Sequence, residues 1–239
     1  MYQHLYLEEN EVLTAWLQLD VSEEMTDHYW RILRDEERDR IGHLSGRLLV
    51  RRTIVRLALR RIAIADVLGI EVKQVEFATS TTGRPILRAD SSPSLNFSSS
   101  SCGGSGLLAL CRTIPIGIDV ESVDEIGDLM HFSQWLLSEN ELEWFDRLGQ
   151  PLTSQDLLRL WTRKEALLKA LGTGIVDSMT SLSFPVESAH EWRMYRSAEI
   201  GSTWQYQDLR CPLSHLAATI VVGLGRPSTP APQIRSVSL

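Results

Sequence analysis

Two long helical patterns, each followed by short apolar runs, set the strongest limits on how this chain can fold. The first runs roughly from Glu36 to Ala65, and its centre, GRLLVRRTIVRLALRRIAIA, has apolar residues at helical spacing. The strand candidates VKQVEFATS, SLNFSSS and GLLALC follow it, with a turn at TTGRP. The second pattern, LLRLWTRKEALLKAL, stops before Gly172, a residue suited to a helix C-terminus. Further strand candidates follow in SLSFPV, EWRMYRSAE, TWQYQDL and HLAATIVVG.

The same order of elements, a helix and then a few strands, therefore occurs twice. It predicts an α+β fold of two similar halves, each a long helix packed on a small, mostly antiparallel sheet. The halves are expected to span residues 1–115 and 116–239, and 239 residues suffice to bury a core in each. The terminus from about residue 226 is rich in Pro and Ser and is expected to be poorly ordered.

Composition excludes several classes of protein. The net charge of −7 argues against general nucleic-acid binding. No apolar run is long enough to span a membrane, and the N-terminus lacks the layout of a secretory signal. The three cysteines, Cys102, Cys111 and Cys211, have no metal-ligand spacing and are expected to be small buried residues in a reducing cytosol. These features predict a cytoplasmic protein.

The first helical pattern carries an unusual concentration of arginine. Between Ile41 and Ala65 there are six arginines and no acid: Arg47, Arg51, Arg52, Arg56, Arg60 and Arg61. Most of them are expected to lie on a solvated helix face. The alternative is a docking place for a phosphorylated ligand or an acidic partner.

Two carboxylates stand directly after an apolar approach in the stretch GIDVESV. If Ile116 to Val120 is a strand, Asp119 and Glu121 lie on one face, with their side chains starting roughly 7 Å apart. Such carboxylates repel each other unless a cation lies between them, and a hard ion such as Mg²⁺ would suit. Two acids at a strand end can also be a solvated turn.

The stretch WTRKEALLKALG holds two of the only three lysines in the chain. Glu165 and Lys169 are four residues apart and share a helix face, so they can form a surface ion pair worth a few tenths of a kcal/mol. That explanation fits any helix. It does not account for lysine at Lys164 and Lys169 in a chain that otherwise prefers arginine, which cannot titrate.

Together, GIDVE and WTRKEALLKALG resemble the paired signature of the 4′-phosphopantetheinyl transferases. The length and the two halves are similar to the surfactin-type group, whose members are pseudodimers in one chain. Gly83-Arg84-Pro85 resembles the family's Gly-Lys-Pro turn beside the adenine end of coenzyme A. The run Asn96-Phe97-Ser98 resembles the family's Asn-x-Ser-His-Ser stretch, and Arg47 resembles a helix arginine that helps hold the nucleotide.

The resemblance implies that coenzyme A donates its 4′-phosphopantetheine arm to a serine of a carrier protein and releases 3′,5′-ADP. It implies Mg²⁺, with Mn²⁺ as an alternative, bound by Asp119, Glu121 and Glu165. Glu165 would also take the serine proton, and Lys169 would hold the pyrophosphate and stabilise the leaving group. Lys164 would help hold phosphate or face solvent.

One residue departs from the family pattern. Ser99 stands where the family has a histidine that contacts phosphate, and serine cannot carry positive charge. Because charge-assisted bonds to phosphate are about twice as strong as neutral ones, we expect weaker coenzyme A binding, or compensation by a cation from the arginine-rich helix. Ser98 and Ser99 remain candidates for binding coenzyme A.

The implied partners are apo acyl or peptidyl carrier proteins, and the enzyme is expected to be a monomer. Carriers of fatty-acid, polyketide and peptide synthesis all fit. Apolar residues after Glu121 either pack in the core or receive the carrier: Leu129, Met130, Phe132, Trp135 and Leu136. Two rival functions remain. One is a degenerate member that binds coenzyme A or a carrier without turnover, and the other is a Mg²⁺-dependent phosphohydrolase, for which no water-positioning motif is present.

Overall fold

The computed structural model describes residues 5–88, 95–124, 129–149, 151–173, 179–196, 200, 203–224 and 230–239. The chain forms two compact units, one of residues 1–113 with 232–239 and the other of residues 114–231. Each unit contains a long helix and a four-stranded sheet, so the predicted α+β class is confirmed.

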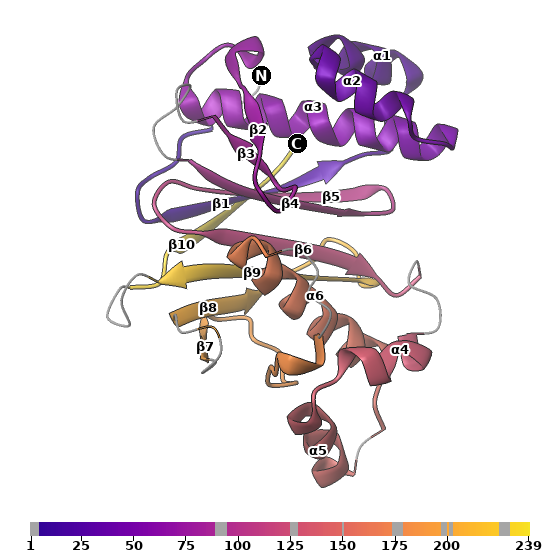
Figure 1. Cartoon of the computed structure of the whole chain (residues 1–239), viewed down its shortest axis with the longest axis vertical. Helices are drawn as coiled ribbons and strands as arrows, with labels where there is room; N and C mark the ends of the chain where they lie inside the picture. The colour runs from indigo at the N-terminus through magenta and orange to yellow at the C-terminus, as the bar shows by residue number, and fades with distance from the viewer. Residues whose placement is uncertain are drawn as a thin grey trace. The chain divides into compact units, whose positions relative to one another are not determined.

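The sheet of the first unit has the strand order β10-β1-β5-β4 (Figure 1). Strand β5 (Ser105–Cys111) lies antiparallel between β1 (Glu11–Gln18) and β4 (Asn96–Cys102), and β10 (Gln233–Ser238) runs parallel to β1. Helix α3 (Arg47–Leu68) covers one face. Its apolar side chains and those of the strands form the core of this unit.

The single helix expected from Glu36 to Ala65 is wrong in one respect, because two helices occupy that stretch. The two helices are α2 (Asp35–Gly42) and α3, which begins only at residue 47. Helix α1 (Glu23–Ile32) precedes both of them. Gly46, which precedes α3, has a φ of 101°. A residue with a side chain rarely adopts that backbone conformation, so the chain turns there instead of continuing the helix.

The predicted strand in VKQVEFATS is mostly not a strand. Its start forms the short 3-10 helix η1 (Val72–Gln74), and only β2 (Phe77–Thr79) is extended. Strand β2 pairs with β3 (Pro85–Leu87) as a small antiparallel hairpin, with the predicted Gly-Arg-Pro turn between them. This hairpin stands apart from the larger sheet as a two-stranded sheet of its own.

The prediction of a poorly ordered terminus is wrong for the last residues, which form β10. Leu239 donates its backbone N–H to Trp16 at 2.8 Å, and Ser236 shares a hydroxyl hydrogen bond of 2.7 Å with Thr14. Arg235 pairs with Glu11. The chain therefore returns from the second unit to complete the sheet of the first.

The sheet of the second unit is antiparallel throughout, with the order β6-β9-β8-β7. Its strands are β6 (Ile116–Ser122), β9 (Leu216–Leu224), β8 (Thr203–Asp208) and β7 (Arg193–Arg196). Helix α6 (Ser154–Leu171) packs on β6 and β9 and ends at Gly172, as predicted. Leucines and alanines of α6 pack against aromatic residues of the sheet.

Two helices of this unit were not predicted as helices. They are α4 (Leu129–Leu136) and α5 (Glu139–Leu148), and Ser138 with Glu141 forms a capping box at the start of α5. The strand predicted in SLSFPV is wrong, because the stretch begins at the end of the 3-10 helix η3 (Met179–Ser181) and continues without strand structure.

The burial of the cysteines and the apolar character of the helices can be compared with what the composition predicted. Cys102 and Cys111 are buried and Cys211 is half-buried. Over the described ranges, no helix combines the length and the apolar character needed to cross a membrane.

Candidate functional site

The candidate site of the second unit begins where β6 lies directly against α6. A Cβ atom at Gly117 would be 1.9 Å from the backbone oxygen of Ala166 and 2.5 Å from the backbone nitrogen of Ala170. Only glycine permits this approach. Because side chains alternate along a strand, Asp119 and Glu121 lie on the same face of β6 as Gly117, the face turned toward α6.

Asp119 forms an ion pair with Lys169 across this contact. Lys169 Nζ donates to Asp119 Oδ1 at 2.6 Å, and the aspartate is 1% exposed. The lysine side chain keeps 30% of its surface exposed. The ion pair therefore joins β6 to α6 instead of linking Glu165 to Lys169 along one helix.

Glu165 is the second acid at this contact. It is 8% exposed, and its Oε1 is buried without a hydrogen-bond partner among the described residues. Burial raises the pKa of Glu165, the negative charge of Asp119 raises this pKa further, and Lys169 opposes both. A buried carboxylate oxygen without a donor is a costly arrangement that a cation or a proton would relieve.

The third predicted acid, Glu121, is half-buried on β6. Within the described part of the chain, no three His, Cys, Asp or Glu side chains lie close enough together to hold a metal. The structure thus brings together Asp119, Glu165 and Lys169, while the role of Glu121 as a ligand stays a prediction.

The raised pKa of Glu165 leads to a testable pH dependence of stability. Between the usual glutamate value of 4.5 and the raised value, the folded state binds a proton that the unfolded state has lost. The free energy of unfolding should therefore fall as pH rises through this window, and Glu165→Gln should remove that fall. Urea unfolding in a chelating buffer from about pH 4 to about pH 8 measures it. Equal slopes for the two proteins would contradict the assignment.

Residues next to Glu165 anchor α6 to the rest of the unit. Arg163 is fully buried and binds both carboxylate oxygens of Asp208 on β8, at 2.9 and 2.6 Å. It also donates to the backbone oxygens of Pro185 and Glu187. These bonds fix the rotation of α6 and so the direction in which Glu165 points.

Lys164 does not occupy either of its expected positions. It is fully buried, and its ammonium donates to Glu141 Oε2 at 2.7 Å and to the backbone oxygen of Leu136 at 2.5 Å. Glu141 also accepts bonds from the backbone N–H groups of Ser138 and Phe184. The lysine therefore does not face solvent, and its ammonium is committed to holding α4 and α5 on α6 rather than to phosphate.

The buried pair of Lys164 and Glu141 leads to a second prediction. Lys164→Met leaves the Glu141 charge buried without its counterion and should lower the free energy of unfolding by about 3–5 kcal/mol in urea titrations. Adding Glu141→Gln removes that charge and keeps an acceptor, so the double variant should be more stable than Lys164→Met alone. Lys73→Met, at an exposed lysine, serves as control. A Lys164→Met variant as stable as wild type would contradict the buried pair.

The candidates for binding coenzyme A in the first unit meet at β4. Gly83 has a φ of 83° in the turn before β3, and Arg84 reaches from this turn to donate to the backbone oxygen of Phe97 at 2.7 Å. Burial lowers the pKa of Arg84. Ser98 is buried and Ser99 half-buried, on opposite faces of β4, and Pro85 lines a cavity.

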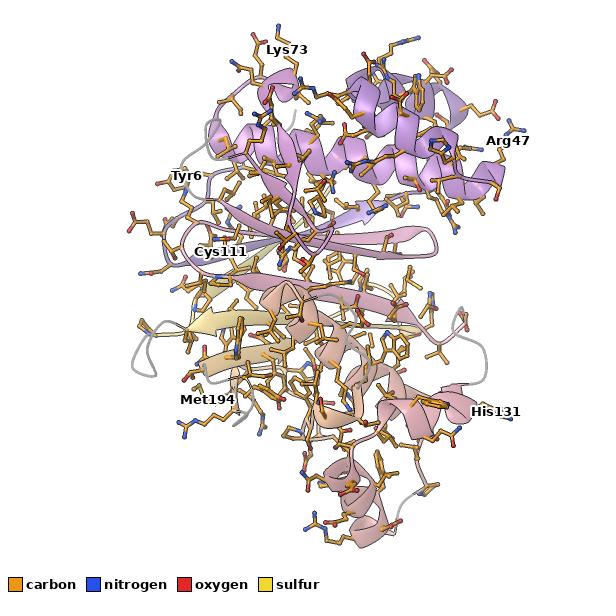
Figure 2. All side chains as sticks on the ribbon, in the orientation of Figure 1. Tyr6, Arg47, Lys73, Cys111, His131 and Met194 are labelled. Carbon is orange, nitrogen blue, oxygen red and sulfur yellow. The ribbon has the colours of Figure 1, made fainter. Side chains whose placement is uncertain are left out.

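Arg47 lies apart from this group. Figure 2 shows it at the start of α3 with its side chain pointing outward, where it pairs with Glu23. Its side chain is 79% exposed. Arg60, which packs over the Phe97 ring, lies more than three helical turns further along, roughly 20 Å. Arg47 therefore differs from the first unit's other predicted coenzyme A residues, because it does not lie near β4.

The apolar residues considered as carrier contacts are split between surface and core. Trp135 is 71% exposed on α4, whereas its neighbour Leu136 is buried. The side chains of Leu129, Met130 and Phe132 lie outside the described residues.

Sequence reasoning missed three residues that build this site, although each carries a signal. Gly117 interrupts an apolar strand, which often marks a close approach of another backbone. Ser138 and Glu141 have the spacing of a capping box, which marks the start of a helix.

Comparison with known proteins places the acidic site within a described family. Residues 115–221 match the family model for the 4'-phosphopantetheinyl transferase superfamily. The matched stretch contains Asp119, Glu165 and Lys169 and none of the first unit's candidates.

The curated relatives carry related names. The 4'-phosphopantetheinyl transferase HetI of Nostoc sp. is 28% identical over 243 residues, which cover 94% of this chain and 97% of the relative. The human L-aminoadipate-semialdehyde dehydrogenase-phosphopantetheinyl transferase is 24% identical over 79% of this chain, and the match spans 66% of its length. The 4'-phosphopantetheinyl transferase psf-1 of Bacillus pumilus is 30% identical over 56% of this chain and 55% of its own.

Proposed function

Because this chain belongs to the 4′-phosphopantetheinyl transferase superfamily, we propose that it transfers the 4′-phosphopantetheine arm of coenzyme A to a serine of an apo carrier protein. The reaction breaks the pyrophosphate of coenzyme A and releases 3′,5′-ADP. The observation that carries the proposal is the contact between β6 and α6, where the Asp119–Lys169 ion pair lies beside Glu165.

The donor set at this contact suits Mg²⁺. In enzymes that act on phosphates, Mg²⁺ is usually bound by one or two carboxylates together with substrate oxygens. Asp119 and the unpartnered oxygen of Glu165 would supply these carboxylates, with Glu121 as a third on the same face of β6. When bound, Mg²⁺, or Mn²⁺ in its place, neutralises charge on the pyrophosphate. Arg163 does not contribute, because its guanidinium is taken up by Asp208.

Lys169 and Glu165 have separate tasks in this proposal. Lys169 keeps part of its side chain exposed while its ammonium points at Asp119, so it can bind the pyrophosphate and stabilise the leaving group. Glu165, whose pKa is raised by burial, is a stronger base than an ordinary glutamate and takes the proton of the carrier serine. Lys164 is omitted from the coenzyme A contacts because its ammonium is buried against Glu141.

The nucleotide end of coenzyme A is assigned to the first unit. Gly83, Arg84 and Pro85 form the turn and strand start beside β4, where Arg84 holds the backbone next to Ser98 and Ser99. Arg47, exposed at the start of α3, would contact the nucleotide only through its long side chain. We assign a monomer in the cytoplasm, and no nucleic-acid partner given the net charge of −7.

A direct assay of carrier mass tests the proposal. The chain is incubated with coenzyme A, Mg²⁺ and a panel of apo carriers from fatty-acid, polyketide and peptide synthesis. A carrier that gains the mass of one phosphopantetheine arm supports the transferase. Unchanged mass for carriers of every class would refute it and support a member that binds without turnover.

A further inference from the structure

A buried threonine lies beside Asp119 on the face of the sheet that α6 covers. Thr219 on β9 is paired in register with Asp119 on β6 and with Asp208 on β8. Side chains of directly opposed residues in antiparallel strands lie on one face, with Cβ atoms about 4.5–5.5 Å apart. Thr219 is therefore the neighbour of Asp119 under α6.

Thr162 contacts this threonine from the helix. The hydroxyl oxygens of Thr162 and Thr219 are 3.1 Å apart, and both residues are 0% exposed. Thr219 donates to Asp208 Oδ1 at 3.3 Å, so the bond between the two threonines takes its proton from Thr162. The backbone oxygen of Arg159 shares that proton at 3.0 Å. The hydroxyl pair therefore ties α6 directly to β9.

The hydroxyl pair lies one helical turn from Glu165. Thr162, Glu165 and Lys169 follow one another at spacings of three and four residues, which place them on one face of α6. On the other side of Glu165, the close contact at Gly117 fixes α6 against β6. The acidic site thus lies between two points at which the helix is held on the sheet.

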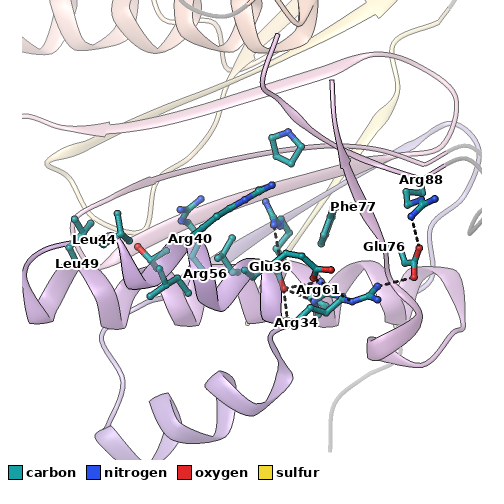
Figure 3. A pocket seen from close by; sticks show the side chains of 16 residues that line it. Arg34, Glu36, Arg40, Leu44, Leu49, Arg56, Arg61, Glu76, Phe77 and Arg88 are labelled. Carbon is teal, nitrogen blue, oxygen red and sulfur yellow. Dashed lines mark hydrogen bonds and ion pairs between the residues drawn. The ribbon is translucent and has the colours of Figure 1, made fainter. Parts of the chain in front are cut away.

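A cavity adjoins the hydroxyl pair. Its volume is about 210 Å³, and Thr162, Thr219 and Asp208 are among the residues that line it. It belongs to the second unit and is distinct from the arginine-lined cavity of the first unit, which Figure 3 shows. Close packing does not hold a helix where a cavity adjoins it. Hydrogen bonds to the sheet must therefore hold α6 at this point.

We propose that Thr162 and Thr219 are positioning residues for the transfer reaction, because their hydrogen bond sets the distance between the carboxylates of Asp119 and Glu165. The inference rests on the proposed function and extends it to two residues that act through these acids. Asp119 lies on the strand and Glu165 on the helix, so a slip of α6 over β9 changes their separation. Replacing a residue that orients metal-binding groups commonly costs about tenfold to a hundredfold in metal affinity or activity.

Kinetics and metal binding of Thr219→Val test this role. Valine has a similar shape but no hydroxyl, so the bond to Thr162 is lost. The kcat of carrier modification should fall about tenfold to a hundredfold, and the KM for coenzyme A should change by less than about threefold. Mn²⁺, titrated in the presence of coenzyme A and followed by electron paramagnetic resonance, should bind about tenfold more weakly. Thr219→Ser keeps the hydroxyl and should restore both kcat and Mn²⁺ affinity to within about threefold of wild type.

Thr14→Val is the matched control. Thr14 is also fully buried and shares a hydroxyl hydrogen bond of 2.7 Å with Ser236, but in the sheet of the first unit. The control should lose stability as Thr219→Val does, while keeping the wild-type kcat and Mn²⁺ affinity. Measurements are made at a temperature where circular dichroism shows every variant folded, so that a loss of stability alone changes neither quantity.

Three outcomes would overturn the inference. These are wild-type kcat and Mn²⁺ affinity in Thr219→Val, an equal loss in Thr219→Ser, or an equal loss in the Thr14→Val control. If Thr219→Val does not fold, Thr162→Val removes the same bond from the helix side and must show the same pattern. The proposed function is tested separately by the wild-type chain. A wild type that modifies no carrier refutes the transferase, whereas weaker Mn²⁺ binding in Thr219→Val supports the positioning role by itself.

Discussion

Asp119→Asn is expected to slow phosphopantetheine transfer by about a thousandfold or more while the chain stays folded. Asparagine has the same shape and can still accept a hydrogen bond from Lys169, but it carries no charge. The substitution therefore removes a proposed metal ligand and the counterion of Lys169 together. Lys169 keeps 30% of its side chain exposed, so its charge remains solvated and the loss of stability should be small.

The rate of carrier modification, followed by mass with Mg²⁺ limiting, measures this effect. Asp124→Asn is the matched control, since Asp124 lies two residues after the end of β6 and its side chain is 73% exposed. The control should keep the wild-type rate, and thermal unfolding should be similar for all three proteins. A full rate for Asp119→Asn would show that the charge of Asp119 serves the ion pair alone.

The parts of this structure that the sequence predicted are those with a local signal. The body and the end of α6 follow from its apolar spacing and from Gly172, whose φ of 73° suits a helix end. The apolar run before Asp119 predicted β6, and alternation placed Asp119 and Glu121 on one face. The rarity of lysine pointed to Lys169, which lies at the site.

Several of the parts that were missed depend on contacts between distant segments. Strand β10 is short and polar, and it becomes a strand because β1, more than two hundred residues earlier, offers an open edge. Lys164 illustrates the same limit at one residue. A helical wheel gives its direction relative to Glu165, but not that Glu141 on another helix would neutralise it in the core.

The close contact at Gly117 leads to the second large effect, because Gly117→Ala should disrupt both the fold and the site. The new Cβ would overlap the backbone of Ala166 and Ala170, and a helix backbone cannot yield as a flexible side chain can. Overpacking of this kind costs about 1–3 kcal/mol or more, and we expect a value at or above the upper end. The overlap can be relieved by a shift of α6 away from β6.

Such a shift would separate Asp119 from Lys169 and Glu165, because the first lies on the strand and the others on the helix. A misplacement of about 1 Å can cost about a hundredfold in rate, so transfer should fall by about that factor even in the folded fraction. Urea unfolding and the carrier assay measure the two effects. Gly42→Ala, at a position where a Cβ meets nothing within 4 Å, is the control and should lower neither the stability nor the rate. Wild-type stability and rate in Gly117→Ala would mean that β6 and α6 are further apart than described, and with them the acids on which the proposed chemistry depends.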